Sequence, residues 1–335
     1  MNKSYKKHIA WSFLIVWWFV LGIFSDRILF RVYSGMDRYF KNSNNAENQL
    51  RYIGGVDLDG SMTKYVPFEL KTSKRIFEEV EKMNPDVSVD VYVRNLNNWP
   101  WFGIHEDEKF ARIWTLKMPL FLAYLKWSEQ EHSAVLEKTY TVNSKGIKNE
   151  WMYNQKDTLE EGGNYTVSQL LKEMIINSNE TATQILRENI PISYLDRIYS
   201  ELGLTLEGGR TDKDDISLKE YSSFFRILYN AAYLSPKTSE FALSLLTQTD
   251  FKEGIIKWVP KSVQVANKFW ERVYVDKAGV KTYKIHDCGV VYYEQYPYMI
   301  CIASTWKNEK ILANTIGETS KIVYEEISKA YPEKK

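Results

Sequence analysis

Residues Phe110–Pro119 read Phe-Ala-Arg-Ile-Trp-Thr-Leu-Lys-Met-Pro, and they lead into a segment, Trp114–Trp127, that is apolar on almost every side. A helix that is hydrophobic all round is buried, so the sequence predicts a central core helix here. Residues three apart share one face of a helix, which places Trp114 against Lys117. Thr115 stands two residues from the lysine and faces elsewhere.

The segments around this helix predict the fold class. Apolar residues at helical spacing predict a helix over Thr72–Met83, and after Pro85 an alternating pattern predicts a strand over 87–93. Strands close to both ends of the chain, with a helical block between them, indicate an α+β sandwich: an antiparallel sheet flanked by helices, plus an all-helical subdomain. The later helices are expected over Leu218–Leu234, Ser239–Gln248 and Lys307–Tyr331.

Composition excludes several classes of function. The chain has 335 residues, of which 44% are hydrophobic and 26% charged, as in an ordinary globular protein. Its formal net charge of +1 provides no basic field, so we expect no binding to nucleic acid. The four histidines, at positions 8, 105, 132 and 286, show no metal-ligand spacing, so we expect no metal and no cofactor.

The N-terminus predicts contact with a membrane through residues 10–30. The uncharged run Ala10–Phe24 follows Lys3, Lys6 and Lys7, and no small-x-small cleavage site follows the run. An uncleaved single-pass anchor is therefore expected, with a cleaved signal peptide or a buried helix as the alternatives. The lysines predict a cytoplasmic N-terminus and an extracytoplasmic main domain at the cell membrane. We expect an anchor (1–33), a polar linker (34–60) and one domain (61–335).

The run around Lys117 resembles the Phe-x-Pro-Ala-Ser-x-x-Lys-Val-Pro segment of class A β-lactamases, a family of penicillin-recognising serine hydrolases. The resemblance implies a serine that attacks the lactam carbonyl and a lysine that helps to take its proton. Trp114 occupies the serine position. An indole nitrogen only donates a hydrogen bond, so Trp114 cannot act as the nucleophile.

Two further segments extend the resemblance over residues 65 to 330. Met174–Leu186 is similar to the helix and turn that carry the Ser-Asp-Asn motif, with Ser178 retained and Glu180 in place of the asparagine. Val265–Trp270 occupies the place of the Lys-Thr-Gly strand and retains only Lys268. The resemblance thus implies that a β-lactamase-like serine hydrolase domain is present with altered motifs.

These replacements predict an obstructed cleft. Glu180 brings a carboxylate toward Lys117 and Lys268, and this charge should keep both lysines protonated in an ion-pair cluster. Phe269 removes the motif's hydroxyl, and Trp270 puts an indole where a glycine normally leaves space. The loop Gly203–Ser217 also lacks the pattern that supplies a deacylating carboxylate, so we interpret its acidic residues as surface charge: Glu207, Asp212, Asp214 and Asp215.

The leading interpretation is a membrane-anchored pseudoenzyme with a binding or scaffolding role at the cell envelope, and no residue is assigned as catalytic. The alternative is a working hydrolase of β-lactams or cell-wall peptide amides that uses Thr115 or Ser178 as nucleophile. In a third interpretation Trp114, Phe269 and Trp270 form a platform for a cell-wall glycan, peptide or protein partner. The alternative is that these side chains only fill a void, which requires no ligand. Cys288 and Cys301 are expected to be buried free thiols, because adjacent antiparallel strands rarely suit a disulfide, and a bridge between them is the alternative.

Overall fold

The structure of the chain is a computed structural model. Within 52–335 the described residues form one compact unit. They are residues 52, 69–83, 85–97, 101–112, 117–130, 134–143, 158–201, 215–294 and 296–332. The predicted anchor and most of the predicted linker lie outside these ranges. Within them, no helix combines the length and the apolarity that crossing a membrane requires.

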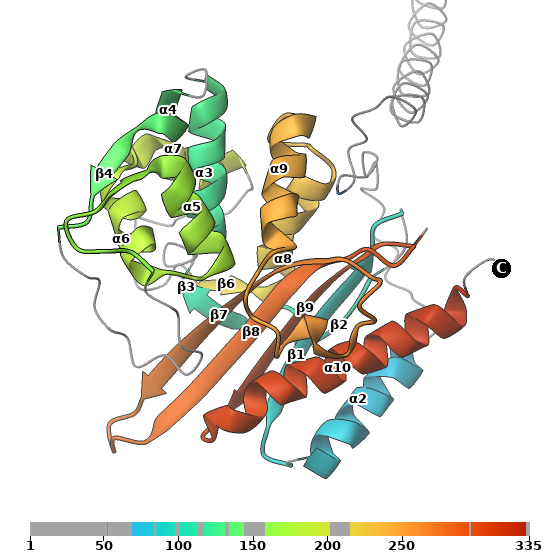
Figure 1. The fold of residues 1–335 in the computed structure, drawn as a ribbon. Helices are drawn as coiled ribbons and strands as arrows, with labels where there is room; N and C mark the ends of the chain where they lie inside the picture. Colours follow the sequence, from blue (N-terminus) through green and yellow to red (C-terminus); the bar gives the residue numbers. More distant parts are fainter. Residues whose placement is uncertain are drawn as a thin grey trace, which may run out of the picture. The chain divides into compact units, whose positions relative to one another are not determined.

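A five-stranded antiparallel sheet forms the centre of the unit (Figure 1), in the order β2-β1-β9-β8-β7. Strands from the two ends of the chain meet in the middle, where β1 pairs with β9 over its whole length. The strands are β1 (Ser88–Asn95), β2 (Trp101–Ile104), β7 (Val265–Val275), β8 (Lys281–Val291) and β9 (Tyr298–Trp306). This pairing confirms the predicted antiparallel sheet with contributions from both ends.

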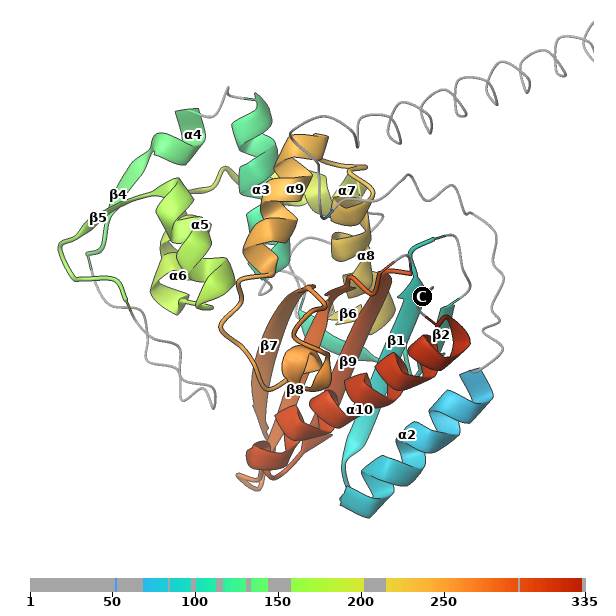
Figure 2. The ribbon, with the colours of Figure 1, turned by 45° about the vertical axis from the view of Figure 1, so that its right-hand side comes forward.

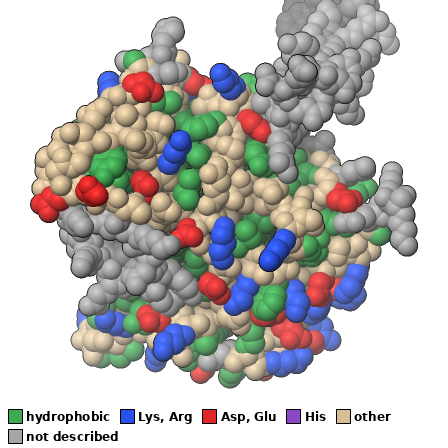
Figure 3. Space-filling view, viewed as in Figure 1, with side chains coloured by type: hydrophobic (Ala, Val, Ile, Leu, Met, Phe, Trp, Pro, Cys, Tyr) green, Lys and Arg blue, Asp and Glu red, His purple; other side chains and the backbone are tan. Residues whose placement is uncertain are grey.

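Two helices cover one face of the sheet. Figure 2 shows α2 (Glu69–Met83) and α10 (Glu309–Ala330) side by side on this face, close to the short helix η2 (Ile255–Trp258). Their apolar residues join those of the sheet in one core cluster that includes Ile76 and Ile316. Basic and acidic side chains alternate over the outer surface of the two helices (Figure 3), where Arg75 pairs with Glu325 at 2.5 Å and Glu326 at 3.1 Å.

The helical block covers the opposite face and contains the second core cluster. Sequence-encoded caps define several of its helices: Thr166 with Gln169 forms a capping box before α5, and Ser217 with Glu220 forms another before α8. Helix α8 ends earlier than predicted, because Asn230 caps it and Ala231 adopts a left-handed φ of 47°. The helices are α3 (Lys117–Gln130), α4 (Ala134–Glu137), α5 (Val167–Ile176), α6 (Glu180–Asn189), α7 (Ile192–Glu201), α8 (Leu218–Tyr229) and α9 (Pro236–Leu246).

Helix α3 is the predicted core helix, described from Lys117 onward. Met118–Leu125 are buried without interruption, which confirms that this segment is enclosed on all sides. Two small sheets border the block: β3 (Lys109–Arg112) pairs with β6 (Asp215–Ser217), and β4 (Thr139–Thr141) pairs with β5 (Asn164–Thr166). The block contacts the central sheet through α8, which packs against β1, β8 and β9, and through α9, which packs against β7.

The two cysteines correct one of our expectations. Cys288 in β8 and Cys301 in β9 lie directly opposite each other and form a disulfide, so the prediction of free thiols is wrong. Their Cα atoms are 4.0 Å apart, which is the close spacing of a non-hydrogen-bonded antiparallel pair. The sequence indicated the hairpin but not its register, and the register brings the sulfur atoms together.

Tyr52 lies within the predicted linker and contacts the folded unit. Its N–H donates to Glu240 Oε2 at 2.6 Å, and its carbonyl accepts from the Tyr292 hydroxyl at 2.9 Å. The rings of Tyr52 and Tyr292 also meet edge to face, with centroids 5.3 Å apart. The chain is thus attached to α9 and to the end of β8 at this point.

Candidate active site

A tight turn between α5 and α6 organises the candidate site. Asn177 caps α5, Ser178 adopts a left-handed φ of 52°, and the Asn179 side chain caps α6 by accepting from the Ala182 N–H at 2.9 Å. A left-handed conformation is uncommon for a residue with a side chain and marks positions held by their surroundings. This turn therefore presents Ser178 and Glu180 from fixed backbone positions.

Lys117 and Glu180 form an ion pair that joins the described start of α3 to the start of α6. The lysine side chain is 7% exposed, and the glutamate side chain is 26% exposed. Glu180 lies in the first turn of α6, where the helix dipole favours a carboxylate. The structure places Glu180 against Lys117, as the sequence analysis expected.

Lys268 lies on β7 with its amine in the interior. Its Nζ donates to the carbonyl of Ile175 at 2.8 Å and contacts the hydroxyl of Ser178. The Ile175 carbonyl belongs to the last turn of α5, where carbonyls lack helical partners and attract cations. Lys268 therefore links the edge strand of the sheet to the turn that carries Ser178.

Burial opposes the positive charge that we expected on Lys268. It is the largest influence on the pKa of Lys268 and lowers it well below the usual lysine value, and the positive charge of Lys117 lowers it further. Glu180 and Asp287 act in the opposite direction without overcoming burial. That both lysines are protonated stays a prediction.

The expected three-membered ion-pair cluster is instead divided into two contacts. Glu180 pairs with Lys117, whereas Lys268 is bonded to Ser178 and Ile175, and no ion pair between Glu180 and Lys268 occurs among the described side chains. The division arises because Lys268 reaches the turn from the sheet side and Lys117 reaches it from α3. The two lysines are thus in different electrostatic surroundings.

Two aromatic residues follow Lys268 on β7. Phe269 is buried and stacks on Phe251 with ring centroids 4.1 Å apart, and the amine of Lys268 lies 5.4 Å from the Phe269 ring centroid. Trp270 is half-buried and packs against the ring of His286 at 5.3 Å. Phe269 is therefore a core side chain that borders Lys268, while Trp270 lies with His286 on the face that carries the helical block.

A buried carboxyl group that the sequence analysis missed lies behind Lys268. Asp287 accepts hydrogen bonds from Asn267 Nδ2 at 2.9 and 3.0 Å and from the Ile255 N–H at 2.9 Å. Burial raises the pKa of Asp287 to about 6, although these hydrogen bonds act to lower it. The signal available in the sequence was an aspartate and an asparagine on strands that otherwise read as buried.

Asp287 should produce a measurable dependence of stability on pH. Its folded-state pKa of about 6 exceeds the ordinary value of 3.8, so the folded protein holds the proton more tightly than the unfolded chain does. Protonation of Asp287 therefore contributes to the free energy of unfolding at low pH, and this contribution is lost as the pH rises from about 4 to about 6. The loss is at most about 1.4 kcal/mol per pH unit. Asp287→Asn should remove this part of the dependence in urea titrations at pH 4.5 and 6.5.

The exposed Asp250 provides a matched control, because Asp250→Asn should leave the difference between the two pH values unchanged. The Asn267 amide can turn its oxygen toward the introduced amide group, so the Asp287→Asn variant keeps its hydrogen bonds. Equal pH dependence in Asp287→Asn and the parent protein would contradict the assignment.

Several predicted positions lie outside the described residues. These are Trp114, Thr115, Glu207, Asp212 and Asp214. Asp215 is described only in its backbone, as the first residue of β6. The structure therefore brings together Lys117, Ser178, Glu180 and Lys268, with Phe269 at their border.

Comparison with known proteins identifies the family of the chain. A model of the beta-lactamase enzyme family matches residues 72–327, and the chain belongs to that family. No curated protein matches the chain.

Solved structures share the fold at low sequence identity. The acyl-enzyme complex of a PBP-A mutant with penicillin G is 19% identical with a TM-score of 0.61, and the match covers 79% of this chain and 100% of that one. A β-lactamase from Chitinophaga pinensis DSM 2588 is 16% identical with a TM-score of 0.64, and the match covers 77% of this chain and 99% of that one. A β-lactamase from Burkholderia phymatum is 20% identical with a TM-score of 0.62, and the match covers 78% of this chain and 99% of that one. At these identities the likeness shows the fold alone.

Proposed function

We propose that this protein is a membrane-anchored, extracytoplasmic β-lactamase-like pseudoenzyme with a binding or scaffolding role at the cell envelope. The observation that carries the proposal is the ion pair between Lys117 and Glu180. In addition, the sequence has Trp114 at the position of the nucleophile in the motif. A lysine engaged by a carboxylate is a poor proton acceptor, and an indole cannot be acylated. Acyl transfer needs both functions at once.

Restoring the serine alone should not restore β-lactam turnover. Trp114→Ser supplies a hydroxyl beside Lys117, but Glu180 still pairs with that lysine and Trp270 remains at the glycine position. Catalytic groups of this kind act as a unit, so repairing one of them recovers little activity. Hydrolysis of a reporter cephalosporin by Trp114→Ser should equal that of the parent protein, and a rate well above it would contradict the proposal.

A combined variant serves as the positive comparison. Trp114→Ser, Glu180→Asn, Phe269→Thr and Trp270→Gly together form the smallest set that could accept an acyl group. Because the set lacks a deacylating carboxylate, intact-mass analysis should find a long-lived penicillin adduct without turnover. Loss of Phe269 also removes its stacking on Phe251, so a cooperative thermal transition must accompany the measurement.

One observation favours the alternative, a working hydrolase. The amine of Lys268 contacts the hydroxyl of Ser178, and burial lowers the pKa of this lysine below its usual value. Ser-Lys pairs act as nucleophile and base, and a lowered lysine pKa favours the role of base. Against it, Ser178 is only 2% exposed. Incubating the full chain with a reporter penicillin and mapping any adduct separates the two proposals, since an adduct on Ser178 that disappears in Ser178→Ala supports the hydrolase.

The proposed anchor predicts that the full-length protein remains with membranes after an alkaline wash and that external protease digests its main domain. The run Ala10–Phe24 and the lysines before it support this, as does the Cys288–Cys301 disulfide, because disulfides persist in oxidising compartments outside the cytoplasm. A double replacement, Ile15→Arg with Phe19→Arg, should release the protein from membranes. Recovery of a soluble parent protein with a mature N-terminus beyond Ser25 would contradict the anchor.

A further inference from the structure

Helix α6 presents polar side chains beyond Glu180. Thr181, Ala182, Thr183 and Leu186 are buried, whereas Gln184, Glu188 and Asn189 are exposed. On one side of the helix, residues at the spacing of a single helical face, i, i+3, i+4, i+7 and i+8, are mostly polar. They are Thr181, Gln184, Ile185, Glu188 and Asn189.

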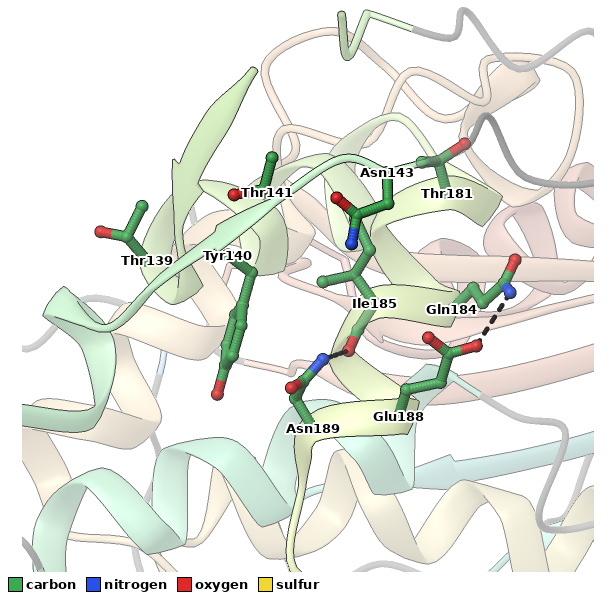
Figure 4. A pocket seen from close by; sticks show the side chains of 9 residues that line it. All are labelled: Thr139, Tyr140, Thr141, Asn143, Thr181, Gln184, Ile185, Glu188 and Asn189. Carbon is green, nitrogen blue, oxygen red and sulfur yellow. Dashed lines mark hydrogen bonds between the residues drawn. The ribbon is translucent and has the colours of Figure 1, made fainter. Parts of the chain in front are cut away.

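This polar face of α6 forms one wall of a cavity of about 360 Å³ (Figure 4). The other wall is β4 with the residues that follow it, and its side chains include Tyr140, Thr141 and Asn143. In Figure 4 the side chains of Tyr140 and Asn143 extend from this strand on the same side. The volume lies at the lower end of the range of about 300–1,000 Å³ for small-molecule sites.

The lining indicates which ligands fit. Among the described residues it contains one carboxylate, Glu188, and no lysine or arginine, so an anionic ligand would be repelled by the lining that the structure describes. A metal ion would need more carboxylate or histidine ligands than the cavity offers. An apolar ligand would leave the amides and hydroxyls of the lining without partners. The remaining class is a neutral molecule rich in hydroxyl and amide groups.

Hydrogen bonds within the lining leave acceptors for such a ligand. Gln184 Nε2 donates to one oxygen of Glu188 at 2.9 Å, and Asn189 Nδ2 donates to the Ile185 carbonyl at 2.8 Å. The second carboxylate oxygen of Glu188 and the amide oxygen of Asn189 can each accept a hydroxyl hydrogen from a ligand. The ring of Tyr140 adds an aromatic surface with a polar end.

We infer that this cavity binds a neutral oligosaccharide segment. A sugar ring presents an apolar C–H face to Tyr140, while its hydroxyl groups meet Glu188, Asn189 and Asn143. A peptide adding to the edge of β4 fits less well, because a strand of three residues offers few main-chain hydrogen bonds. The inference is separate from the proposed pseudoenzyme, since the cavity includes none of the residues of the candidate active site.

Titration calorimetry and saturation-transfer NMR of the full-length protein with chitotriose and cellotriose test the inference. The detergent must lack a sugar headgroup, because such a headgroup would compete. Saturable binding is expected with at least one of the two sugars. Glu188→Ala and Tyr140→Ala should each weaken it on the order of tenfold, whereas Tyr140→Phe, which keeps the ring, should retain most of it.

A matched control keeps the test decisive. Arg187→Ala, at an exposed position of the same helix outside the described lining, should bind like the parent protein. Since Glu188 is exposed and alanine favours helix, Glu188→Ala remains informative even if Tyr140→Ala fails to fold. The inference is overturned if neither sugar saturates, if Arg187→Ala loses binding equally, or if only a sulfated oligosaccharide or a peptide binds.

Discussion

Replacing Leu122 by aspartate should reduce the free energy of unfolding by about 5 kcal/mol, enough to unfold a protein of ordinary stability. Leu122 has no exposed surface and lies in the middle of the uninterrupted buried stretch of α3. The variant loses the packing of the leucine side chain. It also buries a carboxylate, and the substitution introduces no positive charge to pair with it. Urea titration followed by tryptophan fluorescence measures the loss.

Gln130→Asp introduces the same group at an exposed position on the same helix and should change stability by less than about 1 kcal/mol. Glycine in place of Leu120 should cost about 3 kcal/mol or more through lost burial and helix propensity. If Leu122→Asp unfolded at the same urea concentration as the parent protein, α3 could not be the centre of the core.

Replacing Glu180 by glutamine should lower the free energy of unfolding by about 2 to 3 kcal/mol at neutral pH. The change leaves the ammonium group of Lys117 almost buried and without its carboxylate, and breaking one side of such a pair is costly. The expected loss is at the low end for buried pairs because Glu180 is 26% exposed and solvent screens part of the charge. Urea titration of the variant and the parent gives the difference.

A double-mutant cycle isolates the pair. Adding Lys117→Met to Glu180→Gln removes the unpaired charge, so the double variant should be more stable than Glu180→Gln alone. Glu188→Gln, at an exposed position of the same helix, should stay within about 0.5 kcal/mol of the parent protein. Additive losses in the cycle would mean that Lys117 and Glu180 do not interact in solution.

Periodicity predicted the elements whose faces differ most in polarity. The helix over Thr72–Met83 and the closing helix occur close to their predicted bounds, because each buries one face and exposes the other. The alternating strand after Pro85 also occurs, although β1 is buried on both faces. The pairing of β3 with β6 could not be predicted, since it joins short segments far apart in the chain. The outer half of the β7–β8 hairpin was also missed, because it is largely exposed and has no buried face to mark it.

The candidate site was predictable as a set of residues but not as a set of contacts. The motif positions indicated that Glu180 lies near Lys117, and an ion pair follows from charge alone. The contacts of Lys268 with Ile175 and Ser178 depend on how the edge strand β7 packs against the end of α5. The spacing of residues in the sequence does not predict that packing. The pKa of Lys268 likewise follows from burial, which only the folded packing determines.

The pairing of β1 with β9 has a consequence for synthesis. The central sheet joins a strand made early to one made near the end of translation, so a nascent chain that has not yet produced Tyr298–Trp306 leaves β1 and β8 without their shared neighbour. Unpaired strand edges recruit other chains, and contacts between distant segments form slowly. A polypeptide that stops before β9 would therefore expose two open edges and tend to aggregate, however well its helical block had formed.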